Sequence, residues 1–78
     1  MRWGIRYHRL AIQAIYKIER GTAAIVTEAI RQLAANPRPL GSEPFPELSN
    51  TFSIEVADHT IAYEVREAER LIRIIWIA

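Results

Sequence analysis

The sequence predicts an α+β domain in which a helical hairpin packs on a mainly antiparallel, four-stranded sheet. Three observations support this class: alternating apolar residues near the start, helical spacing over residues 8–35, and a return to alternation after residue 50. The expected order is strand, helix, helix, strand, strand, strand, which places both helices on one face of the sheet. With 78 residues, half of them hydrophobic, the chain has room for a single domain spanning residues 1–78.

The first half of the chain contains the predicted helices. Residues 3–7 alternate and predict a short strand, and residues 8–20 then carry apolar side chains at helical spacing. Gly21 is expected to end this first helix and Thr22 to cap a second helix that runs to about Ala35. A break this short between two helices predicts an antiparallel hairpin.

A proline-rich connection follows and leads into the predicted meander. Pro37 ends the second helix, and the connection reaches Asn50 with Leu40, Phe45 and Leu48 as the expected anchors on the core. Alternation then predicts strands over residues 52–56 and 60–65, and an apolar run predicts a third over residues 71–78. Short turns at residues 57–59 and 66–70 join them into an antiparallel meander.

Composition excludes several classes of protein. The chain has no cysteine, so disulfides, zinc ribbons and thiol catalysis are excluded. Its apolar runs are too short for a membrane helix, which needs roughly 20 residues, and the start does not resemble a signal peptide. We therefore expect a cytoplasmic protein without membrane association, metal or cofactor.

Charge divides the chain into two halves. Residues 1–40 hold seven basic and two acidic residues, a net charge of +5, whereas residues 41–78 hold three basic and seven acidic residues, a net charge of −4. This asymmetry favours attraction of an acidic partner by one face, although a solvated surface with clustered charges is the simpler explanation.

Catalytic chemistry has few candidates. His8 and His59 are the only histidines, and neither has a metal-ligand spacing to the other or to a carboxylate. His59, in a predicted turn, is a weak acid/base candidate. Glu67 and Glu69 lie between arginines and predict a solvated ion-pair cluster. No phosphate-binding loop or nucleophile motif is present, so no catalytic residue is assigned.

The order of the elements and several strings resemble the RelE/ParE superfamily of toxins from type II toxin–antitoxin systems. The resemblance covers the whole chain, from a first strand ending at Tyr7 to the apolar last strand. It is carried by the helix end at residues 33–41 (LAANPRPLG), the pair at residues 47–48 (EL) before the sheet, and residues 52–65 (FSIEVADHTIAYEV). The resemblance implies a RelE/ParE-like fold, a toxin function and a cognate antitoxin.

The sequence departs from the mRNA-cutting members of this superfamily. The resemblance places their basic residues at positions that are Ser53, Glu55 and Thr60 in this chain, and further basic residues after the position of Ala78. We therefore expect a toxin that binds a macromolecular target such as DNA gyrase. The alternatives are a ribosome-dependent mRNA endonuclease of the RelE kind, with His59 as its acid/base, and a degenerate member that keeps only antitoxin binding.

Two apolar surfaces are expected to need a partner. On the first helix, Leu10, Ile12 and Tyr16 lie between the core face and a basic stripe, and they should be partly buried. The basic stripe consists of Arg9, Lys17 and Arg20. On the last strand, Ile72, Ile74 and Trp76 are expected to share one face of the sheet. The expected cover is an antitoxin segment or a second copy in a homodimer, or else the connection at residues 37–50 folds over this face.

Overall fold

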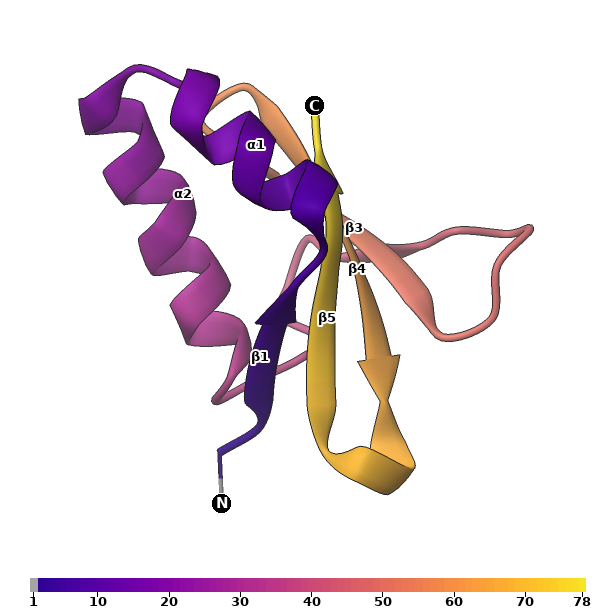
Figure 1. The fold of residues 1–78 in the computed structure, drawn as a ribbon. Helices are drawn as coiled ribbons and strands as arrows, with labels where there is room; N and C mark the ends of the chain where they lie inside the picture. The colour runs from indigo at the N-terminus through magenta and orange to yellow at the C-terminus, as the bar shows by residue number, and fades with distance from the viewer. Residues whose placement is uncertain (1) are drawn as a thin grey trace.

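A computed structural model describes residues 2–78 as two helices packed on one face of a five-stranded mixed sheet (Figure 1). This confirms the predicted α+β class, with one strand more than expected. The elements are β1 (Gly4–Tyr7), α1 (Arg9–Lys17), α2 (Arg20–Leu33), β2 (Glu43–Pro44), β3 (Thr51–Val56), β4 (His59–Arg66), the 3₁₀ turn η1 (Glu67–Glu69) and β5 (Leu71–Ile77). The additional strand, β2, is the two-residue segment within the proline-rich connection.

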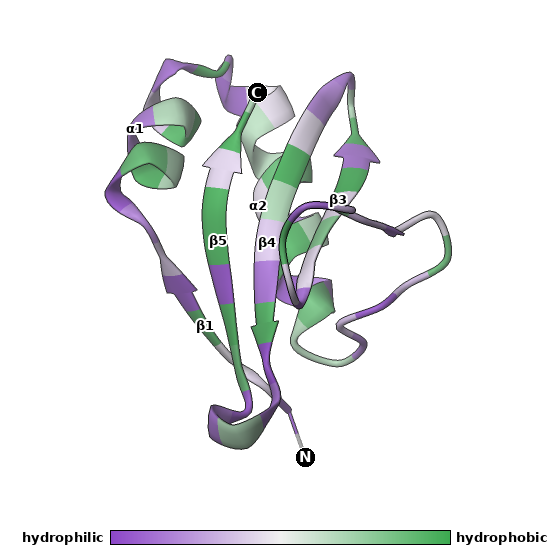
Figure 2. Cartoon of the chain, turned by 90° about the vertical axis from the view of Figure 1, so that its right-hand side faces the viewer, coloured by the Kyte–Doolittle hydropathy of each residue, from purple (hydrophilic) through white to green (hydrophobic). Residues whose placement is uncertain are grey.

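The strands lie in the order β1-β5-β4-β3-β2, so β4 is the middle strand, β5 lies between β4 and β1, and β1 and β2 form the edges. β1 runs parallel to β5, and every other neighbouring pair is antiparallel. α1 and α2 cover one face, and the opposite face, hereafter the open face, has no helix over it (Figures 1 and 2). The helix-covered face supplies the core, which contains Ala11, Val26, Ile30, Leu33, Ile61, Tyr63, Val65, Ile72, Ile74 and Ile77.

The last strand departs from the predicted alternation at Ile75. Tyr63 pairs with Ile74, but the preceding residue Ala62 pairs with Trp76, which leaves Ile75 as an extra residue in a β-bulge. The bulge reverses the sides of the residues that follow it, so Ile77 enters the core and Trp76 faces the open side. The expectation that Ile72, Ile74 and Trp76 share a face is therefore wrong, because strict alternation does not survive a bulge.

The helical hairpin forms as predicted, but its break lies three residues earlier in the chain. α1 ends at Lys17, and Ile18 has extended backbone angles. Glu19 is the N-cap of α2, since its Oε1 accepts a hydrogen bond from the Thr22 backbone N–H at 3.0 Å. Gly21 and Thr22 thus lie inside the first turn of α2. The glutamate side chain satisfies a donor of this turn, so neither residue is needed as a cap.

The connection between α2 and β3 is fixed by other contacts than those expected. Leu40 and Leu48 are exposed, so they do not anchor it. Phe45 does, because its backbone N–H donates to Thr51 at 2.9 Å and its ring packs on Trp76. Buried Tyr63 holds the start of the connection by donating its hydroxyl to the Pro37 carbonyl at 2.7 Å. The rest of the loop projects from the open side of the sheet (Figure 1).

The predicted turns are present and contain residues with left-handed backbone angles. Ala57 and Asp58 join β3 to β4 with φ values of 51° and 67°, the positive pair that a two-residue type I′ hairpin requires. The second turn is η1, which ends at Arg70 with φ 48°. The charged turn expected between β4 and β5 is therefore a single 3₁₀ turn.

Candidate functional site

The exposed surface of α1 is the first candidate site. α1 lies against β5 through buried Ala11, with Ala14, Ile15 and Ile18 half-buried beside it. Its other side exposes apolar groups: Tyr16 is 84% exposed, Leu10 56% and Ile12 41%. These three side chains are more exposed than the sequence suggested. Ile12 and Tyr16 lie one helical turn apart and line a common groove with Ile15, so these three residues define the α1 surface. Leu10 lines neither groove of this surface and lies on the other flank of the helix.

Two grooves flank Tyr16. One, of about 300 Å³, is lined by Tyr7, Ile12, Ile15 and Tyr16. The other, of about 500 Å³, runs between the helices, and its lining consists of Ile15, Tyr16, Ile18, Arg20, Ala23, Ala24, Thr27 and Glu28. Tyr16 therefore stands between two shallow, mainly apolar hollows, and a partner helix or strand could contact it from both sides.

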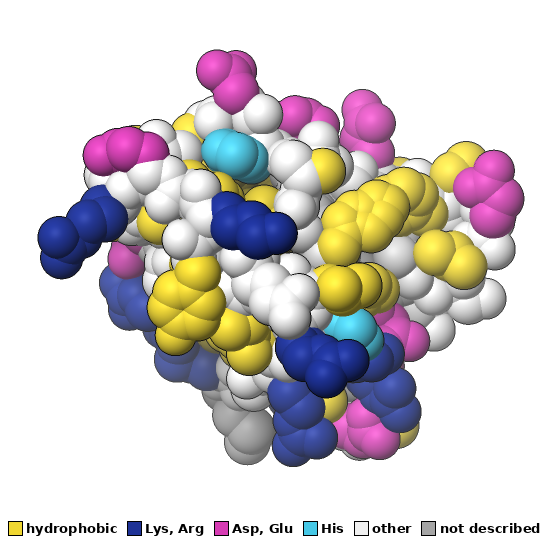
Figure 3. All heavy atoms as spheres, turned by 45° about the horizontal axis from the view of Figure 1, so that its top comes forward, with side chains coloured by type: hydrophobic (Ala, Val, Ile, Leu, Met, Phe, Trp, Pro, Cys, Tyr) yellow, Lys and Arg dark blue, Asp and Glu magenta, His cyan; other side chains and the backbone are white. Residues whose placement is uncertain are grey.

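The basic residues around this surface are arranged differently from the predicted stripe. Arg9 and Lys17 lie on α1 and are exposed, but Arg20 is the first residue of α2 because α1 ends early. Arg20 nevertheless lines the groove between the helices. On the face that includes α1, basic groups and patches of hydrophobic side chains lie close together (Figure 3). This combination suits an amphipathic, acidic segment.

Sequence reasoning missed the contribution of α2 and β1 to these grooves. Ala23, Ala24 and Thr27 leave space beside Tyr16, and Tyr7 closes the groove on the β1 side. A run of small residues on the outward side of α2 was the available signal. Burial raises the pKa of the Tyr7 hydroxyl above its ordinary value.

The open face is the second candidate site. Trp76 is 39% exposed there and packs against Phe45 in an edge-to-face arrangement. Ile72 and Ile74, expected to join Trp76 in a partner surface, are fully buried on the other side of the sheet. They cannot contact a partner in this fold, so the expected three-residue surface on the last strand reduces to Trp76.

At one end of the open face lie the positions where mRNA-cutting relatives were expected to carry cations. Thr60 donates its hydroxyl to the Glu55 carboxylate at 2.6 Å, and Ser53 lies in the next outward position of β3. His59 is half-buried, with its Nδ1 3.2 Å from the Ala78 carbonyl oxygen. A carboxylate therefore occupies this end of the face. Within residues 2–78, no cluster of His, Asp and Glu has a metal-binding arrangement.

Comparison with protein families identifies the class. Residues 5–78 match the family of ParE toxins of the type II toxin–antitoxin system parDE, and the chain belongs to this family. It is thus the toxin component of a type II system, whose other component is an antitoxin. The resemblance inferred from the sequence is confirmed. A comparison with curated protein sequences gives no match.

Solved structures with the same fold are toxin–antitoxin proteins. The RelBE2 complex from Mycobacterium tuberculosis matches with a TM-score of 0.86 and 20% identity, over 99% of this chain and 96% of that chain. The intact RelBE complex from E. coli gives 0.85 and 10%, over 97% and 94%. The RelE–RelB complex from Pyrococcus horikoshii OT3 gives 0.81 and 15%, over 99% and 93%. At these identities the likeness establishes the fold.

Proposed function

We propose that this toxin acts by binding a macromolecular target in the cytoplasm and does not cut mRNA. The observation that carries this proposal is the Thr60–Glu55 hydrogen bond at the end of the open face. Phosphodiester cleavage needs cations beside the scissile phosphate to stabilise the charge of the transition state. A carboxylate at that place repels RNA, and the neighbouring Ser53 supplies no positive charge.

The experiment is a translating ribosome extract to which purified toxin is added, with cleavage mapped by primer extension. We expect no site-specific cuts, whereas a ribosome-dependent mRNA endonuclease added to a parallel reaction produces them. Cuts within A-site codons that disappear in His59→Ala would overturn the proposal and restore the endonuclease alternative.

DNA gyrase is the target that the resemblance to ParE toxins favours. The matching test is a supercoiling assay with purified gyrase, in which the toxin is expected to inhibit and the toxin–antitoxin complex is not. A toxin that binds its antitoxin, but neither inhibits gyrase in this assay nor cuts mRNA in the ribosome extract, would be a degenerate family member. None of the described helices is long and apolar enough to cross a membrane.

We further propose that the antitoxin docks on the α1 surface. A predominantly apolar patch around Tyr16, with Arg20 in one groove, matches the apolar and acidic faces of an amphipathic helix. Tyr16→Ala should weaken antitoxin binding by about 2 kcal/mol if the side chain is an anchor. The antitoxin is sought as the product of the neighbouring open reading frame, and affinity is measured by calorimetry.

Leu40→Ala is the matched control, because Leu40 is fully exposed on the connection between α2 and β2. Equal affinities for the Tyr16 and Leu40 variants would refute docking on α1. A second copy of the toxin is the other candidate to bind the α1 surface. Analytical sedimentation of the free toxin shows whether it is a monomer or a dimer. A dimer that Tyr16→Ala dissociates would identify the α1 surface as a homodimer interface.

A further inference from the structure

Two arginines face each other directly on the open face of the sheet. Arg6 of β1 pairs in register with Arg73 of β5. Their neighbours Ile5, Ile72 and Ile74 point into the core, so both guanidinium groups leave the sheet on the side away from the helices. Like charges directly opposite each other on neighbouring strands are destabilising.

A hollow lies over this pair at the end of the sheet near η1. Its volume is about 460 Å³, and its lining consists of Arg6, Arg66, Glu69, Leu71 and Arg73. Three cations thus line one cavity, with a single carboxylate among its lining residues. We refer to this set as the Arg6–Arg73 hollow. Trp76 and the Thr60–Glu55 pair lie further along the same face.

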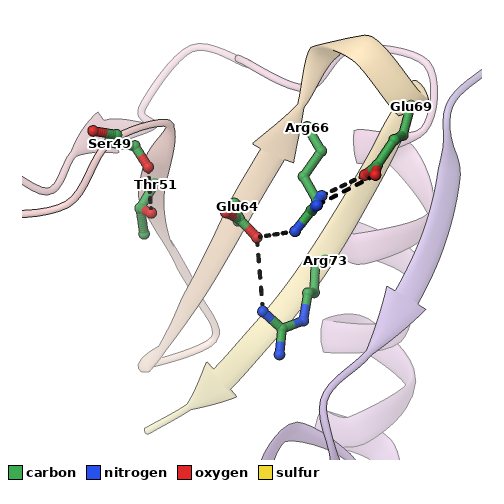
Figure 4. Close-up of polar contacts among 6 residues, drawn as sticks. All are labelled: Ser49, Thr51, Glu64, Arg66, Glu69 and Arg73. Carbon is green, nitrogen blue, oxygen red and sulfur yellow. Dashed lines mark hydrogen bonds and ion pairs between the residues drawn. The ribbon is translucent and has the colours of Figure 1, made fainter.

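The two carboxylates nearby are shared unevenly among the three arginines, and their hydrogen bonds go to Arg66. Glu69 forms a hydrogen-bonded ion pair with Arg66 through both of its oxygens. Glu64 lies between Arg66 and Arg73, but its Oε1 is 3.6 and 3.8 Å from their Nη1 atoms (Figure 4). These distances are too long for hydrogen bonds, and this buried oxygen has no hydrogen-bond partner.

Arg6 and Arg73 therefore retain their donors. Among residues 2–78, Arg6 makes no ion pair or hydrogen bond, and Arg73 makes only the long contact with Glu64. The hydrogen bond from Arg66, and then the charges of Arg66 and Arg6, lower the pKa of the Glu69 carboxyl, so this group stays ionised and stays with Arg66. An anion placed between Arg6 and Arg73 would relieve their repulsion and use their forked donors.

We propose that the Arg6–Arg73 hollow binds one oxyanion, with an acidic side chain of a partner protein as its source. Two neighbouring guanidinium groups that make no hydrogen bond to residues 2–78 can hold one carboxylate or phosphate group. Glu64 and Glu69 beside them repel further negative charge, which disfavours a nucleic-acid strand and permits a single acidic side chain. This site lies on the face opposite α1 and does not depend on where the antitoxin docks.

The experiment titrates the purified toxin with inorganic phosphate and with succinate, at constant ionic strength set by chloride. Binding is followed by the NMR signals of the arginine side chains and by the thermal unfolding midpoint. We expect saturable binding in the wild type, weakened about tenfold or more in Arg6→Gln and in Arg73→Gln because each loses a charge-assisted contact. Arg6→Lys, which keeps the charge and loses the fork, should be intermediate.

Arg31→Gln is the matched control, because Arg31 is exposed on α2 and already paired with Glu28. It should bind both anions as the wild type does. In chloride alone, Arg6→Gln should leave the unfolding midpoint unchanged or raise it, since it removes a like-charge neighbour. Binding that is absent in the wild type, or unchanged in both Arg6→Gln and Arg73→Gln, would overturn the proposal.

The affinities for different anions separate the sources of the anion. Succinate binding at least as tightly as phosphate supports an acidic protein side chain. The third titration uses a nucleic acid. A short single-stranded oligonucleotide that binds more tightly than both, with a steep dependence on salt, would contradict the restriction to a single anion.

Discussion

Phe45 and Trp76 meet edge to face on the open side of the sheet, with ring centroids 5.9 Å apart and an angle of 68° between the ring planes. Trp76 reaches this position only because the bulge at Ile75 turns it away from the core. Phe45 reaches it as the residue that directly follows β2, the short strand within the proline-rich connection. The contact therefore joins β5, next to the β1 edge, to the segment that follows β2 at the opposite edge, and it covers part of the apolar group that the bulge exposes.

The first prediction concerns this aromatic pair. Single variants Phe45→Ala and Trp76→Ala and the double variant should give a coupling free energy of about 1 kcal/mol, as edge-to-face pairs do. Urea unfolding of the four proteins measures it. Phe45→Ala combined with Tyr16→Ala, on the opposite side of the sheet, should be additive within about 0.5 kcal/mol. A coupling no larger than in this control would mean that the pair does not hold the connection.

The second prediction separates core from partner surface on β5. Ile74→Val should lower the free energy of unfolding by about 1 kcal/mol, because Ile74 is fully buried and the change leaves a small cavity. Antitoxin affinity of the folded protein should not change. Ile25→Val, at a position 56% exposed on α2, should alter stability by less than about 0.5 kcal/mol. Weaker antitoxin binding by folded Ile74→Val would argue against this assignment.

The third prediction concerns the hydroxyl of Tyr63. Tyr63→Phe removes the hydrogen bond to Pro37 and leaves a carbonyl without its partner, which should cost about 1 kcal/mol of stability. The connection at residues 38–50 should also become more sensitive to proteolysis. Tyr16→Phe, which removes an exposed hydroxyl, is the control and should change neither quantity. Equal proteolysis rates in wild type and Tyr63→Phe would show that this bond does not fix the loop.

The fourth prediction is a pH dependence at the start of α2. Hydrogen bonds from the backbone of Gly21 and Thr22 lower the pKa of Glu19 below its usual 4.5. A lowered pKa in the folded state means that Glu19 stabilises the protein above pH 4.5 and that this contribution is lost as the pH falls through the folded pKa. Glu19→Gln should therefore be less stable than the wild type at neutral pH and equally stable in acid.

Thermal unfolding of both proteins from neutral to acidic pH measures this difference. Glu47→Gln is the control, since the Glu47 side chain has no hydrogen bond or ion pair among residues 2–78. A wild-type minus Glu19→Gln difference that does not shrink on acidification would rule out the cap as its cause.

Much of the fold could be predicted from the periodicity of apolar residues, because a helix or strand that buries one face must repeat apolar residues at its own period. Alternation in residues 52–56 and 60–65 predicts β3 and β4 correctly, since neither strand contains a bulge of its own. It fails in β5, where an almost uninterrupted apolar run carries no mark of the extra residue at Ile75. The helix break was misplaced because glycine is the common signal for a helix end and a glutamate N-cap is not.

The candidate sites also differ in how far they could be predicted, because one lies on a single helix and the other depends on the pairing of distant strands. The α1 surface is local, so the four-residue spacing of Ile12 and Tyr16 on one helix was enough to place them side by side. The Arg6–Arg73 hollow depends on parallel pairing between the first and last strands, which lie 67 positions apart in register. No local pattern reports that pairing. Such a site is visible only after the sheet order is known.

The two layers of this fold also limit how partners compete. Tyr16 lies on α1, in the helix layer, and Trp76 lies on the opposite face of the sheet, against Phe45. A partner that covers α1 alone leaves Trp76 in contact with solvent. For a target that binds the open face, neutralisation by steric occlusion therefore requires an antitoxin long enough to turn around an edge of the sheet. A shorter antitoxin would form a ternary complex with any target held on the open face. It would then have to inhibit without displacing that target.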